Sequence, residues 1–141
     1  MRLARRLREF ETGKSRKGPG GRYVTLFVDL NFEEELLDFL EAKKNVKIKK
    51  KFQLIADMLV SGMSVTKELY RHEKVSEQAR DVYVFRIKIE GNHRIYTKEF
   101  YEGYSRKIVL IAYENKKTEG LSKKIKDLIE RIGEYDYEFQ E

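Results

Sequence analysis

The residues in this chain that are best suited to chemistry are arginines, lysines and tyrosines in two adjacent β-patterned segments. Arg86 lies in "DVYVFRIKIEG", and Arg94, Tyr96 and Lys98 lie in "HRIYTKEFY". Because alternate side chains of a strand share a face, Arg94, Tyr96 and Lys98 should point the same way, and the tight-turn signal "EGN" places Arg86 on the neighbouring strand. Two guanidinium groups so placed can clamp a phosphodiester and neutralise the charge that grows during its cleavage.

Further cations follow the apolar segment "KIVLIAY", where Lys116 and Lys117 stand in the charged turn "ENKKTEG". We expect this pair to bind phosphate at the edge of a sheet, although a solvated turn has the same composition. Aromatic residues next to basic ones can stack on unpaired bases. The weaker candidates for RNA contact are therefore His93, Tyr96, Lys98, Tyr113, Lys50 and Lys51.

Each of these residues also has a purely structural interpretation. Arg86 can pair with a nearby acid such as Asp81 or Glu90, and Arg94 can form a cross-strand ion pair. Tyr96 and Tyr113 can be core aromatics with a solvated hydroxyl. The functional interpretation therefore depends on the combination of residues and not on any one of them.

Composition narrows the chemistry that this combination can perform. The chain has no cysteine and two histidines, which excludes thiolate catalysis, disulfides and sites built from several histidines. No carboxylate spacing indicates a metal site, and no glycine-rich phosphate loop or nucleophile elbow is present. RNA carries its own nucleophile, the 2′-hydroxyl, so an enzyme that cuts it needs charge stabilisation and proton transfer but no metal or cofactor. We expect neither.

The elements that would position these residues can be read from hydrophobic periodicity. "RYVTLFVDL" predicts a strand, "NFEEELLDFLEAKK" and "VKIKKKFQLIADMLVSG" predict two helices, and Asn31 is in position to cap the first of them. "KIVLIAY" is apolar on both faces, which is typical of a central strand, and a helix should follow it and end at Gly133. We predict an α+β domain in which two N-terminal helices pack on a mainly antiparallel sheet of 4–5 strands, with a further C-terminal helix.

Charge divides the chain of 141 residues into two parts. The formal net charge is +6, and residues 1–22 alone hold eight basic and two acidic residues. We predict that 1–22 is a basic, flexible arm, with at most a short helix over "LARRLREF", and that 23–141 is a single domain. The tail "EYDYEFQE" predicts an edge strand or a packed tail, or else a nucleic-acid mimic. No apolar run is long enough for a membrane helix and no secretory signal is evident, so we expect a cytoplasmic protein.

The stretch "VYVFRIKIEGNHRIYTKEFYEGYSRKIVLIAYENKKTEGLSKKIKDLIER" resembles the RelE/ParE toxin superfamily, in particular its HigB-like branch. The matching motifs are Arg86-Ile87, Arg94-Ile95-Tyr96 and Lys116-Lys117-Thr118, and the resemblance covers roughly residues 23–133. It implies the toxin of a type II toxin–antitoxin system that acts as a ribosome-dependent, metal-independent mRNA endoribonuclease. By position, it implies catalytic roles for Arg86, Arg94, Lys116 and Lys117.

The same resemblance implies the partners and leaves two alternatives. The partners would be a cognate antitoxin protein and mRNA on the ribosome, with no membrane, and the free toxin would be a monomer or a small homo-oligomer. The first alternative is a ParE-like inhibitor of DNA gyrase. The second is a catalytically inactive interaction domain on the same fold.

Overall fold

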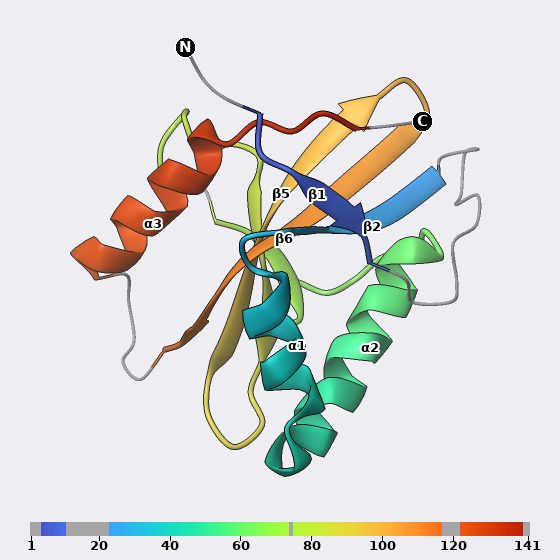
Figure 1. Cartoon of the computed structure of the whole chain (residues 1–141), viewed down its shortest axis with the longest axis vertical. Coiled ribbons are helices and arrows are strands. Elements are labelled where there is room, and N and C mark those ends of the chain that lie inside the picture. Colours follow the sequence, from blue (N-terminus) through green and yellow to red (C-terminus); the bar gives the residue numbers. More distant parts are fainter. Residues whose placement is uncertain (1–3, 11–22, 74, 117–121, 140–141) are drawn as a thin grey trace.

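The computed structural model describes residues 4–10, 23–73, 75–116 and 122–139 as an α+β structure. Figure 1 shows a twisted sheet with α1 and α2 side by side and α3 on the other side of the sheet. In chain order, the elements are β1 (Leu7–Glu9), β2 (Tyr23–Asp29), α1 (Glu33–Glu41), the 3₁₀ turn η2 (Lys43–Asn45), α2 (Val46–Val60), β3 (Tyr70–His72), β4 (Val82–Ile87), β5 (His93–Glu102), β6 (Ser105–Asn115) and α3 (Lys123–Glu134).

The sheet has six strands in the order β1-β2-β6-β5-β4-β3, more than the four to five predicted. β4, β5 and β6 form the expected antiparallel meander, and β2 runs parallel to β6. β6 therefore lies inside the sheet between β2 and β5, as its two apolar faces predict. β1 and β3, at the two edges of the sheet, are three residues long each.

The prediction of a helix over "LARRLREF" is wrong. Leu7–Glu9 pair antiparallel with Phe27–Asp29, and Arg5 forms a bridge with Tyr137 of the C-terminal tail. Arg5 Nε donates a hydrogen bond to the buried carboxylate of Asp29 at 2.6 Å, and the Tyr137 hydroxyl donates to the same oxygen at 2.6 Å. Backbone pairing and this shared acceptor outweigh a weak helical pattern in a short segment. Residues 11–22 of the predicted arm lie outside the described part of the chain.

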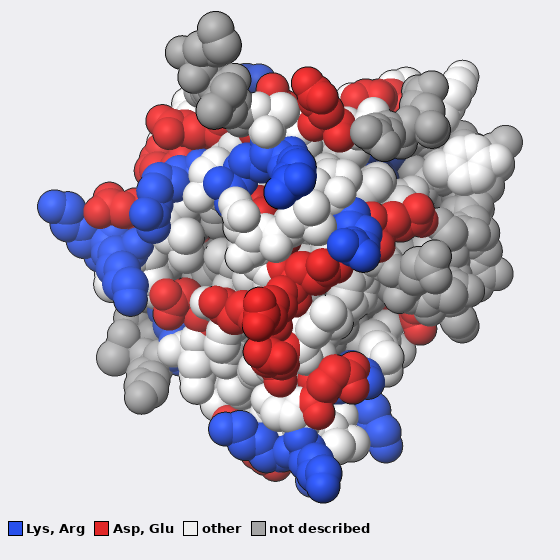
Figure 2. Space-filling view, in the orientation of Figure 1, with Lys and Arg blue, Asp and Glu red and all other residues white. Residues whose placement is uncertain are grey.

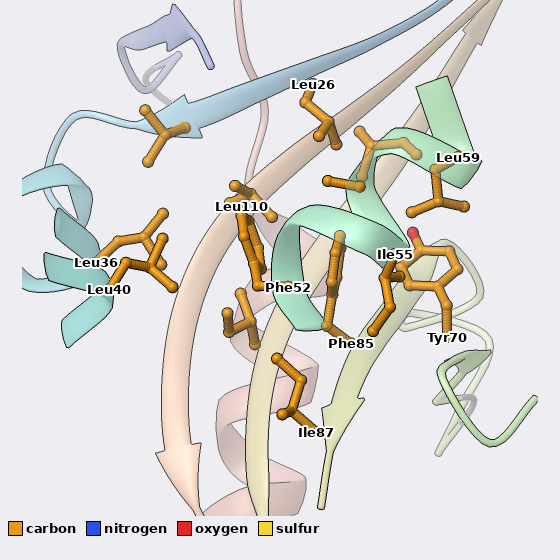
Figure 3. Close-up of a cluster of buried hydrophobic side chains, with 14 of the residues drawn as sticks. Leu26, Leu36, Leu40, Phe52, Ile55, Leu59, Tyr70, Phe85, Ile87 and Leu110 are labelled. Carbon is orange, nitrogen blue, oxygen red and sulfur yellow. The ribbon is translucent and has the colours of Figure 1, made fainter. Parts of the chain in front are cut away.

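One face of the sheet is covered by α1 and α2, as predicted. Phe52 and Ile55 of α2 and Leu36 and Leu40 of α1 pack against strand residues such as Phe85 (Figure 3). Asn31 does not cap α1, because the helix begins at Glu33 without a side-chain cap. The Asn31 backbone N–H donates instead to the Asp29 carboxylate at 2.8 Å.

The opposite face is covered by α3 and the residues that follow it. Ile125, Ile129 and Ile132 of α3 pack with Val84 and Tyr96 in a second core. Gly133 does not end α3, which continues to Glu134. A Cβ at Gly133 would lie 2.3 Å from the carbonyl oxygen of Gln78, so only glycine allows the helix to approach that loop so closely. No helix in the described ranges is long and apolar enough to cross a membrane.

Candidate functional site

Arg86 and Arg94 are brought together by the register of β4 and β5, as the sequence predicts. They are directly opposite each other across the two strands, next to the opposed pair Val84 and Tyr96. Val84 and Tyr96 belong to the core under α3, and side chains two residues apart share a face of a strand. Both arginines therefore project on the face that α3 covers, beside the buried tyrosine.

β3 and the residue directly after it add Arg71 and Glu73, which the sequence analysis did not select. Arg71 lies opposite Val84, and its Nε is 2.7 Å from Glu73 Oε1. The same carboxylate oxygen is 3.8 Å from Arg94 Nη1, and the side chains of Arg94 and Glu73 are only 3% and 5% exposed. Within the described residues, Glu73 is thus the ion-pair partner of Arg94, and Arg86 forms no ion pair with Asp81 or Glu90. We call Arg71, Glu73, Arg86 and Arg94 the arginine cluster.

The arginine cluster has more positive charge than its single carboxylate can balance. Burial and the charges of Arg71 and Arg94 lower the pKa of Arg86, against the smaller opposing effects of Glu73 and Glu68. Burial removes hydration from the guanidinium, and the two neighbouring cations add a positive local potential. An anion placed beside the cluster would relieve this potential.

The cluster is also short of hydrogen-bond acceptors. In the described part of the chain, Nε of Arg86 and both Nε and Nη1 of Arg94 are buried without a hydrogen-bond partner. A buried donor that stays unpaired costs about 1–3 kcal/mol. Phosphate oxygens are the acceptors that match guanidinium donors best, because they accept paired, charge-assisted hydrogen bonds.

Tyr96 adds a neutral donor at the edge of the cluster. Its hydroxyl is buried and has no hydrogen-bond partner among the described residues. Burial raises the pKa of Tyr96 to about 12, with Arg94 acting in the opposite direction. The hydroxyl therefore keeps its proton at neutral pH and can donate it in a hydrogen bond to an anion.

Glu114 and Lys124 border the cluster on the side of β6 and α3. Glu114 lies opposite Arg94 in the register of β5 and β6. Lys124, in the first turn of α3, has its Nζ 3.9 Å from Glu114 Oε1. The row Arg86, Arg94, Glu114 and Lys124 thus crosses the sheet to the start of α3, and its net charge is positive.

Of the three remaining predicted lysines near the sheet, Lys98 and Lys116 are in the described part of the chain. Lys98 Nζ donates to the carbonyls of Gly133 and Tyr135 at 2.9 and 2.7 Å, where a cation complements the C-terminal end of α3. Lys116 is buried directly after β6, and its backbone N–H donates to the Asn92 carbonyl at 2.8 Å. Lys117 lies outside the described residues.

The other predicted RNA contacts are not part of the arginine cluster. His93 and Tyr113 lie on the opposite face of the sheet, where His93 Nδ1 and the Tyr113 hydroxyl are 2.7 Å apart and both rings pack near Phe39 of α1. Lys50 and Lys51 belong to α2, which covers that face. The structure thus divides the predicted residues between the two faces.

Acidic and basic side chains are unevenly distributed over the surface of the described residues. Figure 2 shows an acidic band over α1 and basic side chains gathered at the tip below it and over α3. The acidic band reflects the five acids of α1: Glu33, Glu34, Glu35, Asp38 and Glu41. α3 carries four basic residues, Lys123, Lys124, Lys126 and Arg131, and three acidic ones, Asp127, Glu130 and Glu134. The local potential over α1 is therefore negative, whereas the charges of α3 nearly balance.

Within the described ranges, no group of three or more histidine or acidic side chains is arranged to hold a metal ion. Comparison of the chain with protein-family models, curated proteins and solved structures gives no match. The site must therefore be interpreted from its own geometry.

Proposed function

We propose that this protein is a RelE/HigB-like toxin that cleaves mRNA on the ribosome without a metal, and that the arginine cluster binds the scissile phosphate. The observation that carries the proposal is the pairing of Arg86 and Arg94 on adjacent strands, with buried N–H groups that have no acceptor among the described residues. Such a site supplies charge stabilisation, which is the main requirement of phosphoryl chemistry.

The proposed reaction uses the 2′-hydroxyl of the RNA as nucleophile. Its oxygen attacks the adjacent phosphorus, the bond from phosphorus to the 5′-oxygen breaks, and a 2′,3′-cyclic phosphate and a 5′-hydroxyl result. The proton lost by the 2′-hydroxyl is balanced by the proton gained by the leaving oxygen. Arg86 and Arg94 would bind the non-bridging oxygens, on which negative charge grows, and the Tyr96 hydroxyl would donate to one of them.

The remaining predicted residues extend this proposal. Lys116 directly follows β6, the strand next to β5, so it is placed at the same end of the sheet as Arg94. That Lys116 and Lys117 aid phosphate binding stays a prediction, as do the antitoxin and ribosome as partners. Arg71 is a positioning residue, because its ion pair orients Glu73 and not a substrate.

The proposal is tested by inducible expression in bacteria, with mapping of new mRNA 5′ ends. We expect codon-phased cuts with the wild type, and their loss with Arg86→Gln and with Lys117→Ala. Arg80→Gln is the matched control, because Arg80 is an exposed arginine whose carboxylate partners, Glu77 and Asp81, are also exposed. Growth arrest without cuts, or cuts that persist unchanged in folded Arg86→Gln, would overturn the proposal.

A further inference from the structure

A second candidate site lies on the other face of the sheet, next to the turn between β4 and β5. It is a cavity of about 400 Å³ that opens between α1, the start of α2 and the ends of β5 and β6. We call it the hairpin cavity. Its lining combines aromatic rings with polar groups and includes Phe39, Lys44, Asn45, Glu90, His93 and Tyr113.

The aromatic wall of the hairpin cavity consists of three rings. The ring centroids of Phe39 and Tyr113 are 4.2 Å apart, and the His93 ring stacks on that of Tyr113 at 5.9 Å with an interplanar angle of 17°. Asn45 Nδ2 donates to the Phe39 carbonyl at 2.7 Å and so fixes the end of α1 that carries Phe39. Rings held in this way form a platform for a planar ligand, because stacking tolerates any flat π-system.

His93 gives the cavity an unused polar group. The residue is 6% exposed, its Nδ1 is engaged by the Tyr113 hydroxyl at 2.7 Å, and its Nε2 is buried without a hydrogen-bond partner among the described residues. Gly91 keeps the space beside this nitrogen free, since a Cβ there would lie 2.9 Å from Nε2 and 3.3 Å from Asn115 Oδ1. The unpaired nitrogen indicates a ligand with a hydrogen-bonding edge.

The charge at the mouth of the cavity indicates the rest of the ligand. Lys44 lines the cavity, and Lys43 and Lys47 are exposed on the same tip, where Figure 2 shows basic side chains together. Glu90, also in the lining, is the acid of the turn. A flat, polar-edged ring with an attached anion matches an aromatic wall with a lysine tip.

We propose that the hairpin cavity binds a nucleobase, with Phe39 and Tyr113 stacking on the ring, His93 Nε2 pairing with its edge and Lys44 meeting the attached phosphate. This site is separate from the arginine cluster, because the consecutive residues His93 and Arg94 project to opposite faces of β5. The inference does not depend on RNA cleavage.

The test is a titration of the protein with each of the four nucleoside 5′-monophosphates, followed by NMR of the histidine rings. The chain has two histidines, and His72 on the edge strand β3 provides an internal control. We expect saturable shifts of the His93 signals with at least one nucleotide, whereas His72, between Arg71 and Glu73, reports separately on nucleotide at the arginine cluster. Tighter binding of a short single-stranded RNA would identify the base as part of RNA, and equal binding would identify a free nucleotide. Unmoved His93 signals with all four nucleotides would overturn the proposal.

Variants separate this site from a nonspecific surface. Tyr113→Leu should weaken binding at least about fivefold, the loss expected for one stacking partner. Lys44→Gln should weaken it about two- to fivefold, as for an exposed charge pair, and Lys67→Gln, also exposed, should not. Because Lys44 is a surface residue, its variant tests the site even if Tyr113→Leu fails to fold. Arg80→Gln, which removes an exposed arginine charge outside both proposed sites, should leave the His93 shifts as they are in the wild type, and an equal weakening there would show nonspecific charge attraction and overturn the proposal.

Discussion

Arg86 and Arg94 are directly opposite each other on β4 and β5, and Arg94 Nη1 lies 3.8 Å from Glu73 Oε1. Like charges that are opposite on adjacent strands destabilise a sheet. Burial, and after it the charges of Arg71 and Arg94, lower the pKa of Arg86, the direction expected for a guanidinium opposite a like charge. In the proposed function, an anion bound beside the two arginines would offset this repulsion.

The two arginines should therefore differ in their effect on stability. We expect Arg86→Gln to leave the free energy of unfolding within about 0.5 kcal/mol of the wild type, because a repelled, partly exposed charge is removed. Arg94→Gln should cost about 3 kcal/mol or more, because it removes a buried partner of the buried Glu73. Urea denaturation of both variants at pH 7 measures the difference. Equal losses of unfolding free energy in Arg86→Gln and Arg94→Gln would contradict this prediction.

Removal of the carboxylate should create a dependence on anions. Glu73→Gln leaves Arg71, Arg86 and Arg94 without their shared counter-charge, and we expect a loss of about 3–5 kcal/mol. Inorganic phosphate should restore more stability to Glu73→Gln than to the wild type, because an anion that binds only the folded state stabilises it by mass action. Thermal denaturation over a phosphate series, with chloride at matched ionic strength, measures this. A phosphate response identical to that of the wild type would show that the cluster holds no anion.

Part of this site could be predicted from the sequence because its geometry is local. Arg86 and Arg94 are joined by a short hairpin, and strand alternation determines that Tyr96 shares the face of Arg94. Arg71 and Glu73 could not be found in the same way. Arg71 belongs to β3 and Glu73 directly follows it, and the position of this three-residue edge strand depends on pairing with β4 across a longer connection.

The fold, too, could be predicted only where its determinants are local in the sequence. The periodicity of residues 33–60 predicts α1 and α2, and the apolar faces of "KIVLIAY" predict that β6 is central. The parallel pairing of β2 with β6 joins segments about eighty residues apart and leaves no local pattern. The apolar spacing in "LARRLREF" predicts a helix and not β1. The segment forms a strand because it pairs with β2 and Tyr137, which are distant in the sequence.

Tyr96 should affect pH dependence more than stability at neutral pH. Its pKa is raised to about 12, so its contribution is fully present below the ordinary value of about 10 and is lost as pH rises through about 12. We expect Tyr96→Phe to be as stable as the wild type at pH 7, because the removed hydroxyl has no partner among the described residues. Between pH 10 and 12 the variant should lose less stability than the wild type. Urea denaturation from pH 7 to pH 12 measures the stability of both proteins. If the stability of Tyr96→Phe and that of the wild type fell in parallel above pH 10, the raised pKa of Tyr96 would be contradicted.

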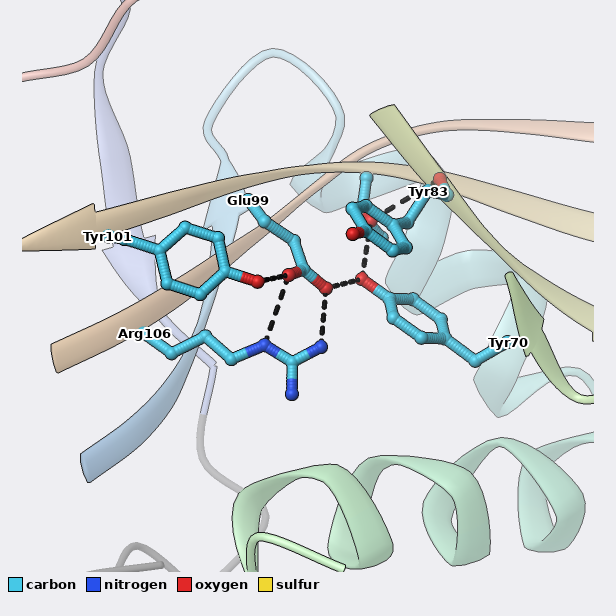
Figure 4. A network of polar contacts seen from close by, with 6 residues as sticks. Tyr70, Tyr83, Glu99, Tyr101 and Arg106 are labelled. Carbon is cyan, nitrogen blue, oxygen red and sulfur yellow. Dashed lines mark hydrogen bonds and ion pairs between the residues drawn. The ribbon is translucent and has the colours of Figure 1, made fainter. Parts of the chain in front are cut away.

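A separate polar network stabilises the sheet on the α2 side. The buried carboxylate of Glu99 accepts two hydrogen bonds from Arg106, at 3.0 and 2.7 Å, and one each from the hydroxyls of Tyr70 and Tyr101 (Figure 4). Tyr70 also lies 3.0 Å from the Thr97 hydroxyl oxygen. Each carboxylate oxygen is thus satisfied by two donors, which distinguishes this network from the arginine cluster.

Because the Glu99 network is satisfied, its loss should destabilise the fold without changing ligand binding. We expect Glu99→Gln to cost about 3–5 kcal/mol, since Arg106 would lose its buried counter-charge and the tyrosines an acceptor. Glu102→Gln is the matched control, because Glu102 is 59% exposed and its pair with Lys107 at 3.2 Å should be worth no more than about 1 kcal/mol. Urea denaturation at pH 7 compares the two, and phosphate should not rescue Glu99→Gln as it rescues Glu73→Gln. A loss for Glu99→Gln as small as that for Glu102→Gln would show that burial of this carboxylate contributes little to the fold.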